Sequence, residues 1–221
     1  MKGYVLLVAL VTLLVSCSRA GPAAETKEQK VLTISSTCDV DPNLVSTIEA
    51  HVSFNLGTKL RRGKCLSLED PSLDDIAKAS FKSLQPQDLY GVVLYDLPTN
   101  EVNVTIYSIK DRLAVINLDR LRRGTPRLSD DDERFVRRVK KESMRALGTL
   151  IKVRKCPTYT CAMYPVGDDT NSLDRKGYNF CPPHRIASDK LLVDAGLDVK
   201  NVVDQAIELH EQERQKNTSS D

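Results

Sequence analysis

The pattern of apolar and polar positions predicts a strand and then a helix at the start of the folded part of the chain. Val31 to Ser35 is a short run of residues that favour strands. Leu44, Ile48 and Val52 then recur at four-residue spacing behind Asp41, a residue type that caps helices. Together these two segments predict a β-α unit.

A second helix and three strands follow. Apolar residues from Leu73 to Phe81 predict a helix that begins at Pro71 or Ser72 and ends before the break at residues 85–87. Three segments rich in strand-forming residues come next: Gly91–Asp96, Val102–Tyr107 and Arg112–Leu118. Helices followed by adjacent strands predict an α+β fold, with helices packed on a mixed β-sheet.

The next segment predicts a long amphipathic helix. Ser129 is a good N-cap residue, the acidic residues 130–133 suit the positive end of the helix dipole, and the pattern runs to Gly148 or one turn beyond. Lys141 and Arg145 fall together on the side away from the apolar face. The face expected to pack on the sheet comprises Phe135, Val136, Val139, Ser143, Ala146, Leu147 and Leu150.

Length, composition and charge narrow the class of protein. The 221 residues suit one domain, which we expect over residues 31–210. With 41% hydrophobic and 28% charged residues, the chain is too apolar to be intrinsically disordered. A net charge of +2 and the absence of Trp indicate neither a nucleic-acid partner nor an aromatic stacking platform. Function must therefore come from local motifs.

The N-terminus has the features of a signal peptide. Lys2 precedes the apolar run Val5–Val15, whose 11 residues are fewer than the roughly 20 that a membrane-spanning helix needs. The run ends in Leu14-Val15-Ser16-Cys17, which resembles a bacterial lipobox. Residues 1–16 are then the lipoprotein signal peptide, and Cys17 carries the lipid.

A lipidated Cys17 predicts a protein of the bacterial cell envelope that is anchored to the membrane. Ser18, rather than Asp, follows it and favours the periplasmic side of the outer membrane. Residues 17–30 have no large apolar side chain and predict a flexible tether, and the polar residues 211–221 predict a disordered tail. An ordinary secretory signal cleaved near Ala20 is the alternative.

Three cysteines and one histidine lie close together in the C-terminal part of the sequence. They form the pattern C-x4-C followed by C-x2-H, at Cys156, Cys161, Cys181 and His184. Thiolates and an imidazole in two short-spaced pairs are suitable ligands for a tetrahedral structural zinc ion. Disulfide bonds are the alternative in an oxidising compartment.

Counting the six cysteines favours zinc. If Cys17 carries lipid, five thiols remain, and an odd number cannot all form disulfides. Zinc bound by the C-x4-C…C-x2-H residues leaves Cys38 and Cys65 as one disulfide. His51 and His210 lie on amphipathic segments, where a structural role is the more common one.

The spacing Glu-x5-Gly followed by C-x4-C-x-M-x17-C-x2-H resembles the archaemetzincins, zinc metallopeptidase-like proteins of the metzincin clan with an H-E-x-x-H-x-x-G helix and a four-ligand zinc site. Residues 92–97 and 113–121 also resemble strands of that family, and the likeness covers about residues 31–200. It implies a metzincin-like fold with Met163 as the Met-turn beneath the metal. It further implies a structural zinc site in a C-terminal subregion, formed by Cys156, Cys161, Cys181 and His184, with His184 replacing the usual fourth Cys.

The chain departs from this family at the catalytic metal. Lys141 and Arg145 stand where the family helix has its two His ligands, and cations cannot ligate zinc. The third ligand would fall at Ile151 or Lys155, and neither residue is a suitable ligand.

Glu142 and Gly148 are what remains of the family helix. Glu142 stands at the general-base position but has no metal-bound water to activate. Ion pairs with Arg138 and Arg145, four residues before and three residues after it, explain Glu142 without any chemistry. The departures predict a pseudoenzyme.

We therefore expect a lipid-anchored, catalytically inactive pseudopeptidase that acts as a binding or scaffold module with one structural zinc. Its former cleft, lined by Lys141, Arg145 and Lys152, would hold an acidic peptide or protein or be filled by ion pairs. The alternative is an active zinc-dependent metallopeptidase that uses unrecognised ligands, such as His51 or His210. A third possibility is a domain held by disulfides with no metal.

Overall fold

A computed structural model describes residues 29–69, 71–96, 103–123, 127–129, 132–166 and 170–200. The expected signal peptide, Cys17, His210 and the polar tail lie outside the described residues. Within the described part of the chain, no helix combines the length and the apolar character needed to cross a membrane.

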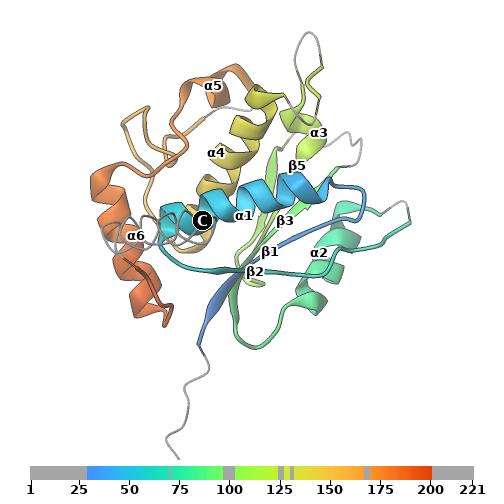
Figure 1. Cartoon of the computed structure of the whole chain (residues 1–221), viewed down its shortest axis with the longest axis horizontal. Coiled ribbons are helices and arrows are strands. Elements are labelled where there is room, and N and C mark those ends of the chain that lie inside the picture. The colour runs from blue at the N-terminus through green and yellow to red at the C-terminus, as the bar shows by residue number, and fades with distance from the viewer. Residues whose placement is uncertain are drawn as a thin grey trace, which may run out of the picture.

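A five-stranded mixed sheet forms the centre of the molecule (Figure 1). The strands are β1 (Val31–Ser36), β2 (Leu60–Arg62), β3 (Asp88–Tyr95), β4 (Thr105–Ser108) and β5 (Leu113–Asn117). Their order in the sheet is β2-β1-β3-β5-β4. Among the described strands, β4 alone runs antiparallel to its neighbour, so the sheet is mixed, as predicted.

Three helices cover the two faces of this sheet. They are α1 (Pro42–Leu56), α2 (Leu73–Ser83) and α4 (Glu133–Leu150). Successive side chains of a strand point to opposite faces, so neighbouring residues of β3 enter different cores. Leu94 packs in the larger core with α1 and α4, whereas Val93 packs with Ile76 of α2. The α+β fold class is confirmed.

Three further helices were not apparent in the sequence pattern: α3 (Leu118–Leu121), α5 (Thr170–Arg175) and α6 (Pro182–Asp194). The first two are too short for a helical period to show. In α6, only Ser188 and Leu192 are buried, so the helix has no continuous apolar stripe. Its position beside α1 comes from tertiary contacts instead (Figure 1).

The N-termini of three helices test the starts that the sequence pattern predicted. The starts of α1 and α2 are confirmed, with Asp41 and Ser72 as N-cap residues. The start of α4 was predicted wrongly, because its cap is Asp132 rather than Ser129. The Asp132 side chain accepts a hydrogen bond from the backbone N–H of Arg134 at 2.8 Å. Both residue types cap helices well, so sequence alone could not choose between them.

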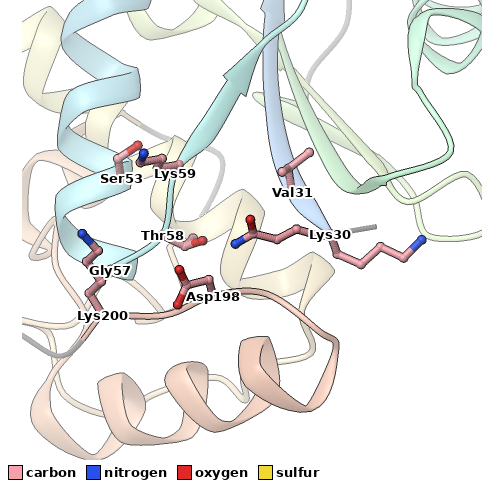
Figure 2. A pocket seen from close by; sticks show the side chains of 9 residues that line it. Lys30, Val31, Ser53, Gly57, Thr58, Lys59, Asp198 and Lys200 are labelled. Carbon is pink, nitrogen blue, oxygen red and sulfur yellow. The ribbon is translucent and has the colours of Figure 1, made fainter. Parts of the chain in front are cut away.

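An open cavity of about 390 Å³ lies between the end of α1 and the segment that follows α6. Figure 2 shows the side chains that line it. Thr58, Lys59, Asp198 and Lys200 are among its lining residues. Because Asp198 lies among the lysines, the lining is of mixed charge. Lys59 is exposed to solvent.

Asp88 ties the start of β3 to β1 and β2. Its buried carboxylate accepts hydrogen bonds from Thr33 Oγ1 at 2.6 Å, Arg61 Nε at 2.9 Å and the backbone N–H of Gln85 at 2.6 Å. Burial alone would raise the pKa of Asp88, but the hydrogen bonds from Arg61 and Thr33 hold it below its usual value. Folding therefore favours the charged carboxylate.

Asp88→Asn should lower the free energy of unfolding at pH 7 by about 2–3 kcal/mol, because Arg61 loses its charged partner. Since the folded-state pKa is depressed, this difference should be full above the unfolded pKa of about 4 and should vanish as the pH falls through the folded pKa. Urea unfolding at several pH values measures both effects. Asp194→Asn, in an exposed pair with Lys190, should change stability by at most about 0.5 kcal/mol. Equal losses in the two variants would contradict the role given to Asp88.

Candidate metal centre

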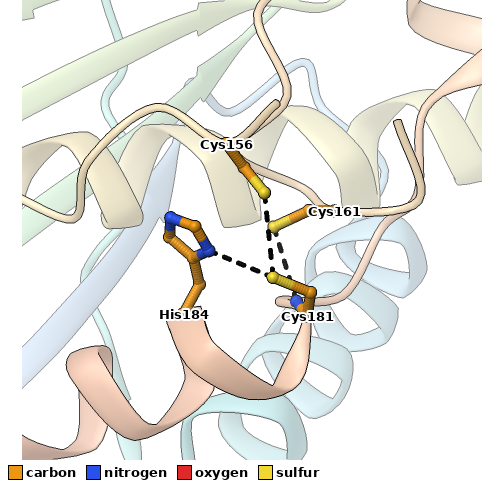
Figure 3. A group of neighbouring side chains, drawn as sticks. All are labelled: Cys156, Cys161, Cys181 and His184. Carbon is orange, nitrogen blue, oxygen red and sulfur yellow. Dashed lines mark hydrogen bonds between the residues drawn. The ribbon is translucent and has the colours of Figure 1, made fainter. Parts of the chain in front are cut away.

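Three cysteines and one histidine meet between the end of α4 and the start of α6 (Figure 3). Cys156 and Cys161 lie in the loop after α4, Cys181 is the N-cap residue of α6, and His184 lies in the first turn of α6. Figure 3 shows the four side chains pointing toward one another. Their ligand atoms all lie within 4.8 Å of one another.

The distance between two of the sulfurs matches a shared tetrahedral metal. The sulfurs of Cys156 and Cys181 are 3.8 Å apart, and Cys181 Sγ lies 3.0 Å from His184 Nδ1. Two sulfurs bonded to one tetrahedral zinc ion at about 2.3 Å are themselves about 3.8 Å apart. Two sulfurs in a disulfide are separated by only about 2.05 Å, and in the structure Cys156, Cys161 and Cys181 are free thiols.

Backbone N–H groups point at two of the sulfurs. The amide of Thr158 donates to Cys156 Sγ, and the amide of Cys181 donates to Cys161 Sγ, each at 3.4 Å. Burial would raise the pKa of Cys156, but the Thr158 contact and the neighbouring thiols hold it below its usual value. Burial raises the pKa of Cys161 to about 11. A bound zinc ion deprotonates its thiol ligands outright, so both sulfurs would be thiolates in a filled site.

Two glycines allow the chain to pack closely around this site. A Cβ atom on Gly177 would lie 1.7 Å from the carbonyl oxygen of Thr160. A Cβ atom on Gly148 of α4 would lie 2.4 Å from Met163 Sδ. Met163 is buried, and its sulfur lies against Gly148 of α4.

Cys38 and Cys65 form a disulfide bond, with their Cα atoms 4.9 Å apart. The bond links the loop before α1 to the segment after β2. It thus joins parts of the chain 27 residues apart, on either side of α1.

Glu142 is buried in α4 and is fully engaged by other protein groups. Its carboxylate accepts hydrogen bonds from Arg145 Nε at 2.9 and 3.1 Å and from Thr105 Oγ1 of β4. Burial alone would raise the pKa of Glu142, but Arg145, with Lys176 and Thr105, holds it below its usual value. Arg145 also lies 6.0 Å from the ring centre of Tyr107 in β4.

Lys141 and Arg138 of α4 bind the α5 region. Lys141 Nζ donates to the carbonyl oxygens of Leu173 at 3.1 Å and Asp174 at 2.7 Å. Arg138 binds the Asp174 carboxylate through both Nε and NH2, at 2.7 and 2.6 Å. Both α4 side chains are buried.

Lys176 approaches the same part of α4 from the loop after α5. It is 3% exposed, and its ammonium donates to the carbonyl oxygen of Ala162 at 3.1 Å. Burial lowers the pKa of Lys176 to about 8, and the nearby Glu142 opposes this shift. Nothing in the sequence around Lys176 distinguished it from a solvated lysine.

The structure corrects the expected surface of α4. Lys141 was placed on the side away from the core, yet it is 6% exposed because α5 covers that side. Of the two expected partners of Glu142, only Arg145 binds it, whereas Arg138 pairs with Asp174 instead. The contributions of Thr105, Asp174 and Lys176 come from distant segments and had no local sequence signal.

The other candidate metal ligands do not join the cysteines. His51 lies in α1 with its ring centre 5.4 Å from that of Tyr178, and burial, followed by Lys140, lowers its pKa to about 4. Ile151 is a buried C-cap residue of α4, and Lys155 is exposed. Within the described residues, the Cys3His set is the only group of three or more such side chains that could hold a metal ion.

Comparison with solved structures identifies the fold. The crystal structure of archaemetzincin from Methanopyrus kandleri is 21% identical, with a TM-score of 0.55, and the match covers 77% of this chain and 99% of that chain. The fold is archaemetzincin-like. A zinc-dependent peptidase from Methanocorpusculum labreanum matches with 17% identity and a TM-score of 0.56, over 71% of this chain and 99% of that chain. No protein-family model and no curated protein sequence matches the chain.

The archaemetzincin-like fold thus carries a Cys3His group that could hold one zinc ion. The donor set fits the metal: three sulfurs and one imidazole nitrogen complete a tetrahedron, with no position left for water or substrate. Such a closed site stabilises structure, because it joins the loop after α4 to the start of α6.

The protein purified without chelators should contain one zinc ion per chain, because one complete ligand set is present among the described residues. A working metallopeptidase that keeps a structural site should contain two, and a domain held by disulfides alone none. Elemental analysis gives this number directly. His184→Ala should release zinc to a chelator much faster than His51→Ala, because only His184 is a proposed ligand. Alkylation and peptide mass spectrometry after chelation should find Cys156, Cys161 and Cys181 as thiols, and a disulfide among them would contradict the zinc site.

Proposed function

We propose that this protein is a catalytically inactive member of the archaemetzincin-like fold, a binding or scaffold module with one structural zinc. Cys17 carries the lipid that anchors it in the bacterial cell envelope, and its partner is an acidic peptide or protein. Cys156, Cys161, Cys181 and His184 hold the zinc, and Met163 occupies the Met-turn position against α4.

The observation that carries this proposal is that other protein groups already bind the carboxylate of Glu142. A general base in a metallopeptidase must accept a proton from metal-bound water. Here both carboxylate oxygens accept hydrogen bonds from Arg145, and one also accepts from Thr105. Arg145 lowers the pKa of Glu142, which makes the carboxylate a weaker base.

The positions where a catalytic metal would need ligands support the same conclusion. Lys141 donates two hydrogen bonds to carbonyl oxygens of α5, and Arg145 is paired with Glu142. The side chain of Ile151 has no atom that can bind a metal, and Lys155 is exposed to solvent. Protein cations thus replace the metal ligands, and their charges balance Glu142 without a metal ion.

An active zinc-dependent peptidase is the second candidate, favoured by the structural likeness to the zinc-dependent peptidase of Methanocorpusculum labreanum. On this reading the metal is bound by ligands outside the described residues or brought in by a rearrangement of α4. The Glu142–Arg145 pair would have to break first.

The purified protein should not cleave a broad peptide library, with or without added zinc. Glu142→Gln should leave this result unchanged and should lower stability, because Arg145 loses a buried partner. The double substitution Lys141→His and Arg145→His should not create activity, since a third ligand is still missing. Mass spectrometry of the library detects cleavage. Zinc-dependent cleavage that Glu142→Gln abolishes would establish the second candidate instead.

Cys17→Ser should move the protein from the membrane fraction to the soluble periplasmic or extracellular fraction, because it removes the lipid attachment site. Fractionation followed by immunoblotting measures the distribution, and intact-mass analysis of the wild type should show loss of residues 1–16 and gain of lipid. Ser18→Ala serves as the matched control and should stay with the membrane. Uncleaved wild-type protein in the cytosol would contradict the anchor.

A further inference from the structure

A second cavity, of about 380 Å³, lies between α4 and the chain that follows α5. Its lining is strongly basic. The four cationic side chains are Arg134, Arg137, Lys141 and Lys176, and they are joined by Asp174, Gly177 and Tyr178. Asp174 is the single carboxylate among them, and Arg138 already binds it through two hydrogen bonds.

The two lysines of this cavity are buried without a carboxylate partner. Lys141 and Lys176 are 6% and 3% exposed. Their ammonium groups donate to backbone carbonyl oxygens, and no carboxylate of a described residue lies within 4.0 Å of either nitrogen. Buried lysines are normally paired with an acidic group, because an uncompensated buried charge is costly.

The charges of the described residues around this cavity do not balance. Among the described residues, three buried cations, Arg138, Lys141 and Lys176, and the half-buried Arg145 share two carboxylates, those of Glu142 and Asp174. A zinc ion on three thiolates and a neutral imidazole adds one negative charge near Lys176. Even then, positive charge is in excess.

The four cationic side chains differ in their exposure to solvent. Arg134 and Arg137 lie in the first turns of α4 and are exposed, whereas the lysines are buried. Arg137 is 3.4 Å from the exposed Glu133, a pair that solvent weakens. A ligand that reaches from the arginines to the lysines therefore needs at least two anionic groups.

We propose that this cavity binds a polycarboxylate ligand, with one carboxylate at Lys141 and Lys176 and another at Arg134 and Arg137. The inference rests on the proposed binding role and locates its site. An acidic peptide and a free polycarboxylate share this chemistry. The site differs from the cleft expected from sequence, which Lys141, Arg145 and Lys152 were to line. Of these three residues, Lys141 alone lines the cavity. Arg145 pairs with Glu142, and Lys152 is exposed beyond the end of α4.

Isothermal titration of the full chain in detergent, at 150 mM salt to screen distant charges, tests the proposal. The probes are a blocked hexaglutamate peptide, its hexaglutamine counterpart and citrate. Hexaglutamate or citrate should bind with a 1:1 stoichiometry and hexaglutamine should not. Tighter binding of hexaglutamate identifies a peptide as the source of the carboxylates, and tighter binding of citrate identifies a free small molecule.

Lys176→Met, which keeps the apolar stem of the side chain and removes its ammonium group, should weaken the affinity for the better probe about tenfold or more. Lys59→Met removes the same charge from an exposed lysine at the other cavity (Figure 2) and should leave the affinity unchanged. Arg137→Gln should weaken binding by a smaller factor, because Arg137 is exposed. Lys176→Met should also unfold at no lower urea concentration than the wild type, since it removes an uncompensated buried charge.

Three results would overturn the proposal: no saturable binding of either anionic probe, equal affinities of Lys176→Met and Lys59→Met, or a marked loss of stability in Lys176→Met that indicates a structural role. Mass spectrometry of hexaglutamate after each titration separates this question from catalysis. Binding followed by cleavage would keep the site and overturn the inactive assignment. Absence of both binding and cleavage would overturn the site and keep the inactive assignment.

Discussion

The burial of α4 on nearly all sides is the constraint on which the rest of the structure depends. The helix carries Arg138, Lys141, Glu142 and Arg145, and the sheet, α1 and the α5 region enclose it. Each charged side chain that loses water must find a partner. Thr105 of β4 and Asp174 of α5 are among these partners, so the polar contacts of α4 fix how the edge of the sheet and the C-terminal region sit against it.

The C-terminal region depends on this helix from one side and on the cysteine cluster from the other. Few apolar residues of α6 are buried, so hydrophobic packing contributes little to holding it. A zinc ion bound by Cys156, Cys161, Cys181 and His184 would supply the missing stability by joining the start of α6 to the loop after α4. The Cys38–Cys65 disulfide acts on a separate part of the chain, around α1.

The cations of α4 link the proposed lack of catalysis to the proposed binding role. Arg145 pairs with Glu142, whereas Lys141 and Lys176, which line an open cavity, pair with no carboxylate of a described residue. A sequence selected for stability alone would replace such lysines with apolar residues. Their presence beside exposed arginines is what the proposed site for an anionic ligand requires.

Several features followed from the sequence because they depend on local spacing. The caps of α1 and α2, the three central strands and the two short-spaced ligand pairs of the Cys3His group are all set by residues a few positions apart. Such local patterns can be recognised without knowledge of the fold. The same local logic predicted the pairing of Glu142 with Arg145 correctly and with Arg138 wrongly, since both lie one helical turn away.

Only the tertiary structure decided which side of α4 meets water. Lys141 has the spacing of a solvent-exposed lysine, but α5, which is about 30 residues further along the chain, covers it and accepts its hydrogen bonds. Lys176 is buried for a similar reason, although its neighbours in sequence give no sign of it. Burial depends on contacts between distant segments, which local periodicity does not contain, and the basic cavity exists because two such segments meet.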